Sequence, residues 1–167
     1  MEGPAIRTVL VVGAGEDQGT AWAGWRVVRL DIDPATSPDI LASMTSLGAI
    51  GPYEAVYCSH ALEHLYPHEV PAALAEFHRV LVPEGMAMIV VPDLQDVAPT
   101  DEALPGMGRQ CGLDLFYGNS REVPARPYMA HHCGFVADTL QRAMNAAGFE
   151  TQTSRLDNYN LMAIGTK

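Results

Sequence analysis

The sequence has few of the features that mark membrane or secreted proteins. Its apolar runs, such as Met86–Val91, stop far short of the ~20 residues that a membrane-spanning helix needs. The segment Met1–Pro4 has neither the basic nor the apolar part of a signal peptide. Cys58, Cys111 and Cys133 follow no disulfide or metal-binding spacing. We therefore expect reduced thiols in a cytoplasmic protein that has no membrane span.

Basic side chains are scarce as well. The 167 residues include 10 lysines and arginines against 20 aspartates and glutamates, which gives a formal net charge of −10 at pH 7. Because nucleic-acid binding draws much of its affinity from basic side chains on phosphates, we expect no nucleic-acid partner. A chain of this length builds one hydrophobic core and has no room for a second, which predicts a single domain over residues 1–167. No feature of the sequence indicates an oligomeric state.

Short apolar segments alternate with helical patterns along the chain. Four of them predict buried strands, at residues 6–12, 26–30, 55–59 and 86–91. Apolar residues at helical spacing predict helices at 70–81 and at about 135–147, the second followed by Gly148 as its C-terminal cap. Residues 150–155 and 160–166 predict a closing pair of strands. This order predicts an α/β fold, a doubly wound and mostly parallel seven-stranded sheet with helices on both faces and an antiparallel last strand.

A glycine- and proline-rich segment without regular periodicity occupies residues 93–130. Connections of this length usually serve a site. The segment leaves the carboxyl end of the fifth strand, beside the crevice where open α/β sheets bind ligands. We expect it to form a lid over that edge and to bring Tyr117 or His131 towards a substrate. Tyr128 is a further candidate for the wall of an acceptor pocket.

Glycines and a carboxylate follow the first two predicted strands. Gly13 and Gly15 come directly after the first strand, where glycine lets the backbone bend sharply and approach a ligand. Asp31 ends the second strand, where a carboxylate can accept hydrogen bonds from both hydroxyls of a ribose. Asp33, before Pro34, is interpreted as a turn or N-cap residue. Together these features predict a site for a nucleoside-containing cofactor, either S-adenosylmethionine or NAD.

Two stretches near the middle of the chain carry a more specific pattern. Residues 53–65 contain a strand followed by S-H-A-L-E-H-L, and residues 76–85 contain R-V-L-V-P-E-G, before a strand that ends in Pro-Asp. In this order they resemble the central signature of class I S-adenosylmethionine-dependent methyltransferases of the type-11 group. Residues 114–118 and 129–135 resemble a subgroup of short predicted methyltransferases, some of which are thought to accompany surface-polysaccharide synthesis.

The resemblance implies S-adenosylmethionine as the cofactor. The turn after the first strand would approach its methionine part, Asp31 would hold the ribose, and Ile32 would lie against the adenine. Ser43 and Met44 stand where an acidic residue usually holds the adenine, and Ser59 would flank the sulfonium. The implied cofactor-binding residues are Gly13, Ala14, Gly15, Glu16, Asp31, Ile32, Ser43, Met44, Ser59 and His60. Val11 and Asp17 depart from the acidic residue and the third glycine of the family pattern.

Histidines recur every four residues at His60, His64 and His68. On a continuous helix they would form a row that zinc could accept, but Pro67 interrupts the helix, so we expect no metal site. His64 is expected instead to anchor the loop after the fourth strand by a hydrogen bond, and Glu63 to do similar work at a helix start.

Methyl transfer depends largely on alignment, because the sulfonium is already an activated electrophile. A hydroxyl nucleophile would also benefit from a base with a pKa near neutrality, which points to histidine. The candidates are His60, His64 and His131, with Asp93 at the mouth of the sheet as a fourth. A structural role is the alternative for each.

The sequence thus predicts methyl transfer from S-adenosylmethionine to a small-molecule or saccharide-like acceptor by in-line attack. An NAD-binding oxidoreductase is disfavoured, because the length leaves no room for the substrate domain of such an enzyme. A non-catalytic, methyltransferase-like binding or scaffold protein is the stronger alternative, since the glycine turn departs from the family pattern.

Overall fold

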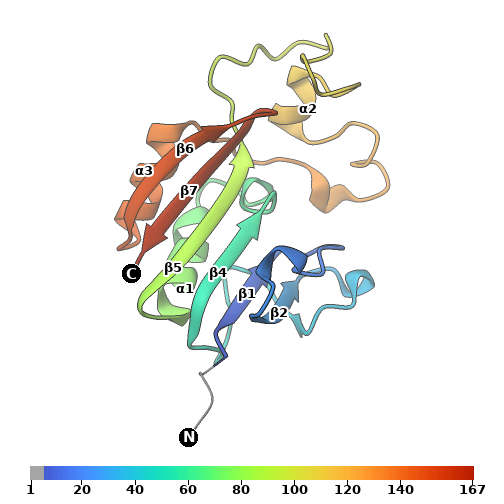
Figure 1. The fold of residues 1–167 in the computed structure, drawn as a ribbon. Helices are drawn as coiled ribbons and strands as arrows, with labels where there is room; N and C mark the ends of the chain where they lie inside the picture. Colours follow the sequence, from blue (N-terminus) through green and yellow to red (C-terminus); the bar gives the residue numbers. More distant parts are fainter. Residues whose placement is uncertain (1–5) are drawn as a thin grey trace, which may run out of the picture.

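A seven-stranded mixed sheet forms the centre of the computed structural model, which describes residues 6–167 (Figure 1). The strand order across the sheet is β3-β2-β1-β4-β5-β7-β6, and β7 runs antiparallel to both of its neighbours. This topology confirms the predicted doubly wound, mostly parallel sheet with an antiparallel last strand. The segment Met1–Pro4 lies outside the described residues. The strands are β1 (Thr8–Val12), β2 (Arg26–Asp31), β3 (Ile40–Leu41), β4 (Tyr53–Ser59), β5 (Leu81–Pro92), β6 (Glu150–Leu156) and β7 (Asn160–Thr166).

Both long predicted helices are present, as α1 (Val70–Val80) and α3 (Ala137–Ala146). The buried residues of α1 are those that its sequence spacing predicts, apart from its end. Leu81, expected to close this helix, instead pairs with Tyr53 and begins β5. Gly148 has a φ of 102° just after α3, as a C-terminal cap requires. Among the described residues, no helix combines the length and the apolar character needed to cross a membrane.

The two helices pack on one face of the sheet, which lies behind it in Figure 1. The three connections from β1 to β4 hold only short 3₁₀ turns and loops, which corrects the expectation of helices on both faces. The connection before β2 is short and contains Gly19 and Gly24, a poor sequence for a helix. Trp22 and Trp25 cover the buried valines of β1 instead.

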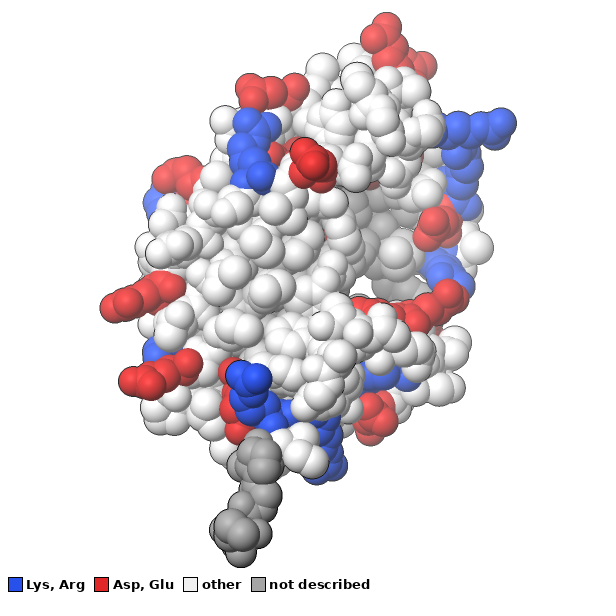
Figure 2. Space-filling model, in the orientation of Figure 1, with Lys and Arg blue, Asp and Glu red and all other residues white. Residues whose placement is uncertain are grey.

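The opposite face of β5, β7 and β6 has no helix over it (Figure 1). Its residues are mainly half-buried and uncharged in the middle of the sheet, for example Met88 on β5 and Met162 and Ile164 on β7. Figure 2 shows this face with charged side chains mostly around its margin. The site described below is therefore built at the edge of a sheet that is covered on one side.

The segment 93–130 is more regular than its sequence predicts. It contains the short helix α2 (Gly112–Tyr117), which starts after Cys111, where Asp114 accepts hydrogen bonds from the backbone N–H groups of Cys111 and Ser120. In Figure 1, α2 lies beyond the carboxyl ends of β4 and β5. The segment therefore lies at the carboxyl edge, as expected. The expectation that it contains no helix was wrong.

Candidate active site

The turn after β1 adopts a backbone that favours glycine. Gly13 and Gly15 have φ values of 64° and 50°. A Cβ atom at Gly13 would lie 2.3 Å from the Cβ of Ala61, so this position has no room for a side chain. A Cβ atom built on Gly15 would have no neighbouring atom within 4 Å, so there is open space beside the backbone at this residue. The turn therefore places exposed main chain at the carboxyl end of β1, where open α/β sheets bind ligands.

Asp31, at the end of β2, is tied into this turn. Its side chain accepts the N–H of Gly15 at 2.7 Å through one oxygen and the N–H of Asp33 at 2.8 Å through the other. Each carboxylate oxygen has two lone pairs, so both can accept one further hydrogen bond. Asp33 caps the next 3₁₀ turn by accepting the N–H of Ala35 at 2.9 Å, which confirms its structural interpretation.

Arg29 is a residue of this region that sequence reasoning missed. From the middle of β2, its guanidinium donates to four backbone carbonyl oxygens, those of Gly15, Asp17, Thr36 and Ser37, at 2.9–3.2 Å. These contacts join the glycine turn to the loop after β2. The available signal was an arginine between Val28 and Leu30 within the strand, since a guanidinium held there needs several acceptors.

A small hollow of about 110 Å³ lies beside the turn. It is lined by the end of β1 and the glycine turn, together with Asp17, Tyr57 and Ser59. Ile32 projects nearby with 62% of its surface exposed, as expected of an apolar side chain that meets a ligand. Glu16 is exposed too.

The remaining cofactor candidates lie after β3. The Met44 methyl lies close to the Gly13 position, about 4 Å from a Cβ atom built there. Ser43 shares a hydrogen bond of 2.8 Å with Thr45, so its hydroxyl already has a partner within its own loop. Met44 therefore lies near the turn, whereas Ser43 is engaged locally.

His60 and Glu63 form a contact at the carboxyl end of β4. His60 has a φ of 50°, and its Nδ1 atom lies 3.4 Å from Oε1 of Glu63. The His60 side chain is half-exposed, whereas Glu63 is only 1% exposed. The contact with the Glu63 carboxylate raises the pKa of His60 above its usual value, against the opposing effect of burial. Glu63 makes no hydrogen bond at a helix start, because the turn Leu62–His64 directs its carboxylate inward, which corrects that expectation.

His64 and His131 lie beside this pair. Their rings form an edge-to-face contact with centroids 5.0 Å apart. His64 Nδ1 lies 3.1 Å from the carbonyl oxygen of Ala130 and its Nε2 lies 3.2 Å from that of His60, which confirms the expected loop anchor. His131 Nδ1 lies 2.9 Å from the carbonyl oxygen of Leu115 in α2, and burial lowers its pKa. The structure thus brings the three predicted histidines together, although they come from two distant segments.

Other predicted residues do not join this group. His68 is exposed and stacks on Tyr66 instead. Asp93 is buried and forms an ion pair with Arg155 of β6, which favours the structural role that was its alternative. Tyr117 and Tyr128 are 64% and 56% exposed, which leaves both rings open to a ligand.

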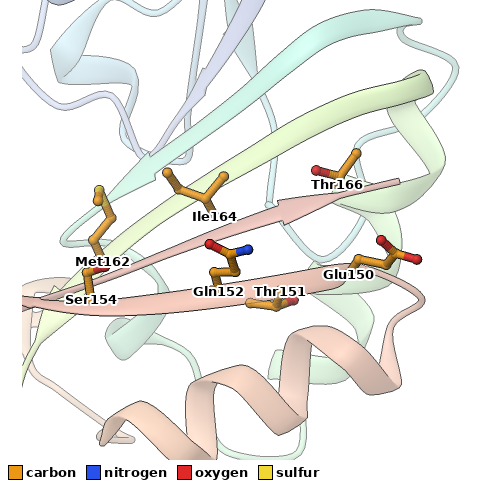
Figure 3. A pocket seen from close by; sticks show the side chains of 7 residues that line it. All are labelled: Glu150, Thr151, Gln152, Ser154, Met162, Ile164 and Thr166. Carbon is orange, nitrogen blue, oxygen red and sulfur yellow. The ribbon is translucent and has the colours of Figure 1, made fainter.

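Figure 2 shows the surface hollowed between the part of the molecule formed by residues 93–130 and the loops that follow β1 and β2. A larger hollow, of about 400 Å³, lies elsewhere, on the uncovered face of β6 and β7 (Figure 3). Its lining includes Gln152, Ser154, Met162 and Ile164, and among its lining residues only Glu150 is ionisable. Its lining includes no residue of β1 or β4 and no histidine, so the carboxyl edge is the better candidate for an active site.

The match to known families decides which cofactor this edge serves. A family model described as a methyltransferase domain matches residues 8–154. The chain belongs to this methyltransferase family. No curated protein sequence matches the chain significantly. The family match favours S-adenosylmethionine over NAD, which was the disfavoured alternative.

Solved structures of the same fold support the family assignment. A methyltransferase from Archaeoglobus fulgidus is 14% identical, with a TM-score of 0.69 over 98% of this chain and 87% of that chain. One from Mesorhizobium loti is 16% identical, with a TM-score of 0.68 over 96% and 90%. The glycopeptide N-methyltransferase MtfA, in complex with S-adenosylhomocysteine, is 14% identical, with a TM-score of 0.69 over 98% and 84%. The chain therefore has both the sequence match and the fold of a methyltransferase, as the sequence predicted.

Proposed function

We propose that this methyltransferase transfers a methyl group to a small-molecule or saccharide-like acceptor bound between the glycine turn and the histidine group of His60, His64 and His131. One observation carries the proposal: the turn that favours glycine and the histidine beside a buried carboxylate meet at the same edge of the sheet. The names of two structural neighbours point to similar acceptors, since one methylates 1,6-didemethyltoxoflavin and another methylates a glycopeptide.

The glycine turn and Asp31 suit the cofactor. The free lone pairs of Asp31 would accept the ribose hydroxyls, and the open space at Gly15 would admit the methionine part. The other contacts to the cofactor would come from Gly13, Ala14, Glu16, Ile32, Met44, Ser59 and His60. Ser43 would contact the cofactor by giving up its hydrogen bond with Thr45. When bound, S-adenosylmethionine supplies an activated methyl group on a sulfonium, so the protein contributes mainly alignment.

His60 is the residue best placed to take a proton from an acceptor hydroxyl or amine. It is half-exposed at the end of β4, and its contact with Glu63 orients the ring and favours the protonated form that it would reach. His64 and His131 would then position His60 and the lid, since backbone carbonyl oxygens already hold both rings. Residues 93–130 would cover the acceptor, with Tyr117 at the surface of this lid.

A non-catalytic binding role is the second candidate. The hollow beside the glycine turn is smaller than the roughly 300–1,000 Å³ of most ligand pockets, and Asp31 already serves the turn. Thermal unfolding with S-adenosylhomocysteine, S-adenosylmethionine and NAD separates the two functions. The methyltransferase should melt at a higher temperature with the first two ligands and unchanged with NAD, because ligands that bind only the folded state stabilise it. No shift at millimolar concentrations would favour the binding role.

A further inference from the structure

Glu63 is the most unusual polar residue of the molecule. It is 1% exposed, and neither of its carboxylate oxygens has a hydrogen-bond partner among the described residues. An unpaired carboxylate in a protein interior is strongly unfavourable unless a cation lies beside it. The nearest group of opposite charge, when protonated, is His60, whose Nδ1 lies 3.4 Å away, longer than a good hydrogen bond. The site therefore has room, and electrostatic need, for a stronger positive charge.

Two further metal-ligand side chains face the same point. Glu63, His64 and His131 each offer one ligand atom, and these atoms lie within 4.8 Å of one another. When Nδ1 of His131 donates to Leu115, its Nε2 keeps a free lone pair. Both ring nitrogens of His64 face carbonyl oxygens, Nδ1 that of Ala130 at 3.1 Å and Nε2 that of His60 at 3.2 Å, so the ring must turn away from His60 for Nε2 to bind a metal ion.

Backbone contacts hold the three ligands together before any ion binds. The N–H groups of His132 and Cys133 both donate to the carbonyl oxygen of Glu63, at 2.9 and 3.2 Å. Together with the contact between His64 and Ala130, these bonds fix the segment 130–133 against the turn Leu62–His64. Carbonyl groups that accept the second ring N–H of a histidine ligand are the usual outer shell of protein metal sites.

We infer that Glu63, His64 and His131 bind a divalent first-row transition-metal ion, with Zn²⁺ as the representative. Two imidazoles and one carboxylate suit this class of ion, whereas Mg²⁺ and Ca²⁺ prefer oxygen ligands alone. Ligands at ~2.1 Å from a tetrahedral Zn²⁺ lie roughly 3.4 Å apart, so ion binding must draw the three ligand atoms, which lie within 4.8 Å of one another, closer together. The sequence predicted no metal because it considered the row ending at His68. In the structure, the group that could bind a metal ion contains His131 in place of His68, and Glu63 in addition.

Three protein ligands leave a coordination position open, as in catalytic zinc sites. An acceptor oxygen or nitrogen in that position would be polarised by the ion, and this role rests on the proposed function. Binding of the ion itself does not depend on it. The alternative is that protonated His60 alone balances Glu63, in which case added metal would find no site.

Calorimetry and thermal unfolding of protein stripped with a chelator test the inference in the absence of any methyl donor. We expect the unaltered protein to bind one Zn²⁺, with a higher melting temperature, and not to bind Mg²⁺. Glu63→Gln should weaken Zn²⁺ binding by more than ~100-fold, beyond the 10–100-fold typical of outer-shell changes. The same variant without metal should melt at a higher temperature than the unaltered protein, because it removes an unpaired buried charge.

His131→Ala should lose Zn²⁺ as Glu63→Gln does, whereas the matched control His68→Ala should bind it normally. Co²⁺ in place of Zn²⁺ gives a visible spectrum that reports its ligands, and this spectrum should disappear in Glu63→Gln. The inference is overturned if the unaltered protein binds no Zn²⁺, or if Glu63→Gln binds it unchanged. S-adenosylhomocysteine binding, measured on the same samples, distinguishes the two proposals. In the unaltered protein, a failure to bind S-adenosylhomocysteine alone contradicts the proposed function, and a failure to bind Zn²⁺ alone contradicts the metal site.

Discussion

The glycine turn and the histidine group meet at one edge of the sheet, but they are built in different ways. The turn is local: Gly13, Gly15, Arg29 and Asp31 lie within 20 residues, and the side chains of Arg29 and Asp31 form hydrogen bonds with the backbone of Gly15. The histidine group joins the turn Leu62–His64 to a segment nearly 70 residues later through contacts that only the folded chain makes. The proposed cofactor half is fixed by local contacts and the proposed acceptor half by tertiary contacts, so the two should respond differently to mutation.

The largest effect is expected at Gly13. Gly13→Ala should lower the free energy of unfolding by about 3–5 kcal/mol, because it combines a positive φ with a direct clash against Ala61. Gly24→Ala is the matched control, since Gly24 has a φ of 84° with no atom nearby, and should cost only about 1–2 kcal/mol. Urea unfolding measures both. Equal losses would show that the close approach of Ala61 is unimportant.

The next effect is expected at Arg29. Arg29→Ala removes the donor to four carbonyl oxygens and should cost about 1–3 kcal/mol of stability, together with weaker S-adenosylhomocysteine binding. Arg26→Ala, at an exposed arginine of the same strand, should change stability by less than about 0.5 kcal/mol. A cofactor affinity that survives Arg29→Ala would argue against its role in shaping the turn.

A smaller and more selective effect is expected at Asp31. Asp31→Ala should weaken S-adenosylhomocysteine binding by about 1–3 kcal/mol, because it removes the proposed acceptor of the ribose hydroxyls and the tie to Gly15. Asp33→Ala removes only a cap and should leave the affinity nearly unchanged. Calorimetry on both variants measures the difference. Similar affinities in the two would place the ribose elsewhere.

These differences explain how much the sequence could predict. Six of the strands, both long helices and the turn at Gly13 follow from local patterns, and the structure confirms them. The sequence could not show that Glu63 is buried without a partner, because this depends on where residues 130–133 pack. The sequence analysis also expected helices on both faces of the sheet. The 13-residue connection before Arg26 instead forms only a 3₁₀ turn, and its two tryptophans cover the second face there.

The smallest effect is expected in the segment 93–130. As a lid, it should be cut by trypsin at the exposed Arg109 and Arg121 in the free protein and more slowly with S-adenosylhomocysteine present. The time course of cleavage measures this change, and Asp31→Ala serves as a variant that should gain less protection. Cutting at the same rate, in a sample shown to bind the ligand, would mean that this segment does not cover the site.

A crystal structure with S-adenosylhomocysteine tests most directly whether the two halves form one active site. We expect the ribose hydroxyls on Asp31, the homocysteine part beside Gly13 and Gly15, and the sulfur facing the histidine group. A ligand bound instead in the hollow over β6 and β7, or with its sulfur directed away from the histidine group, would contradict the proposed site.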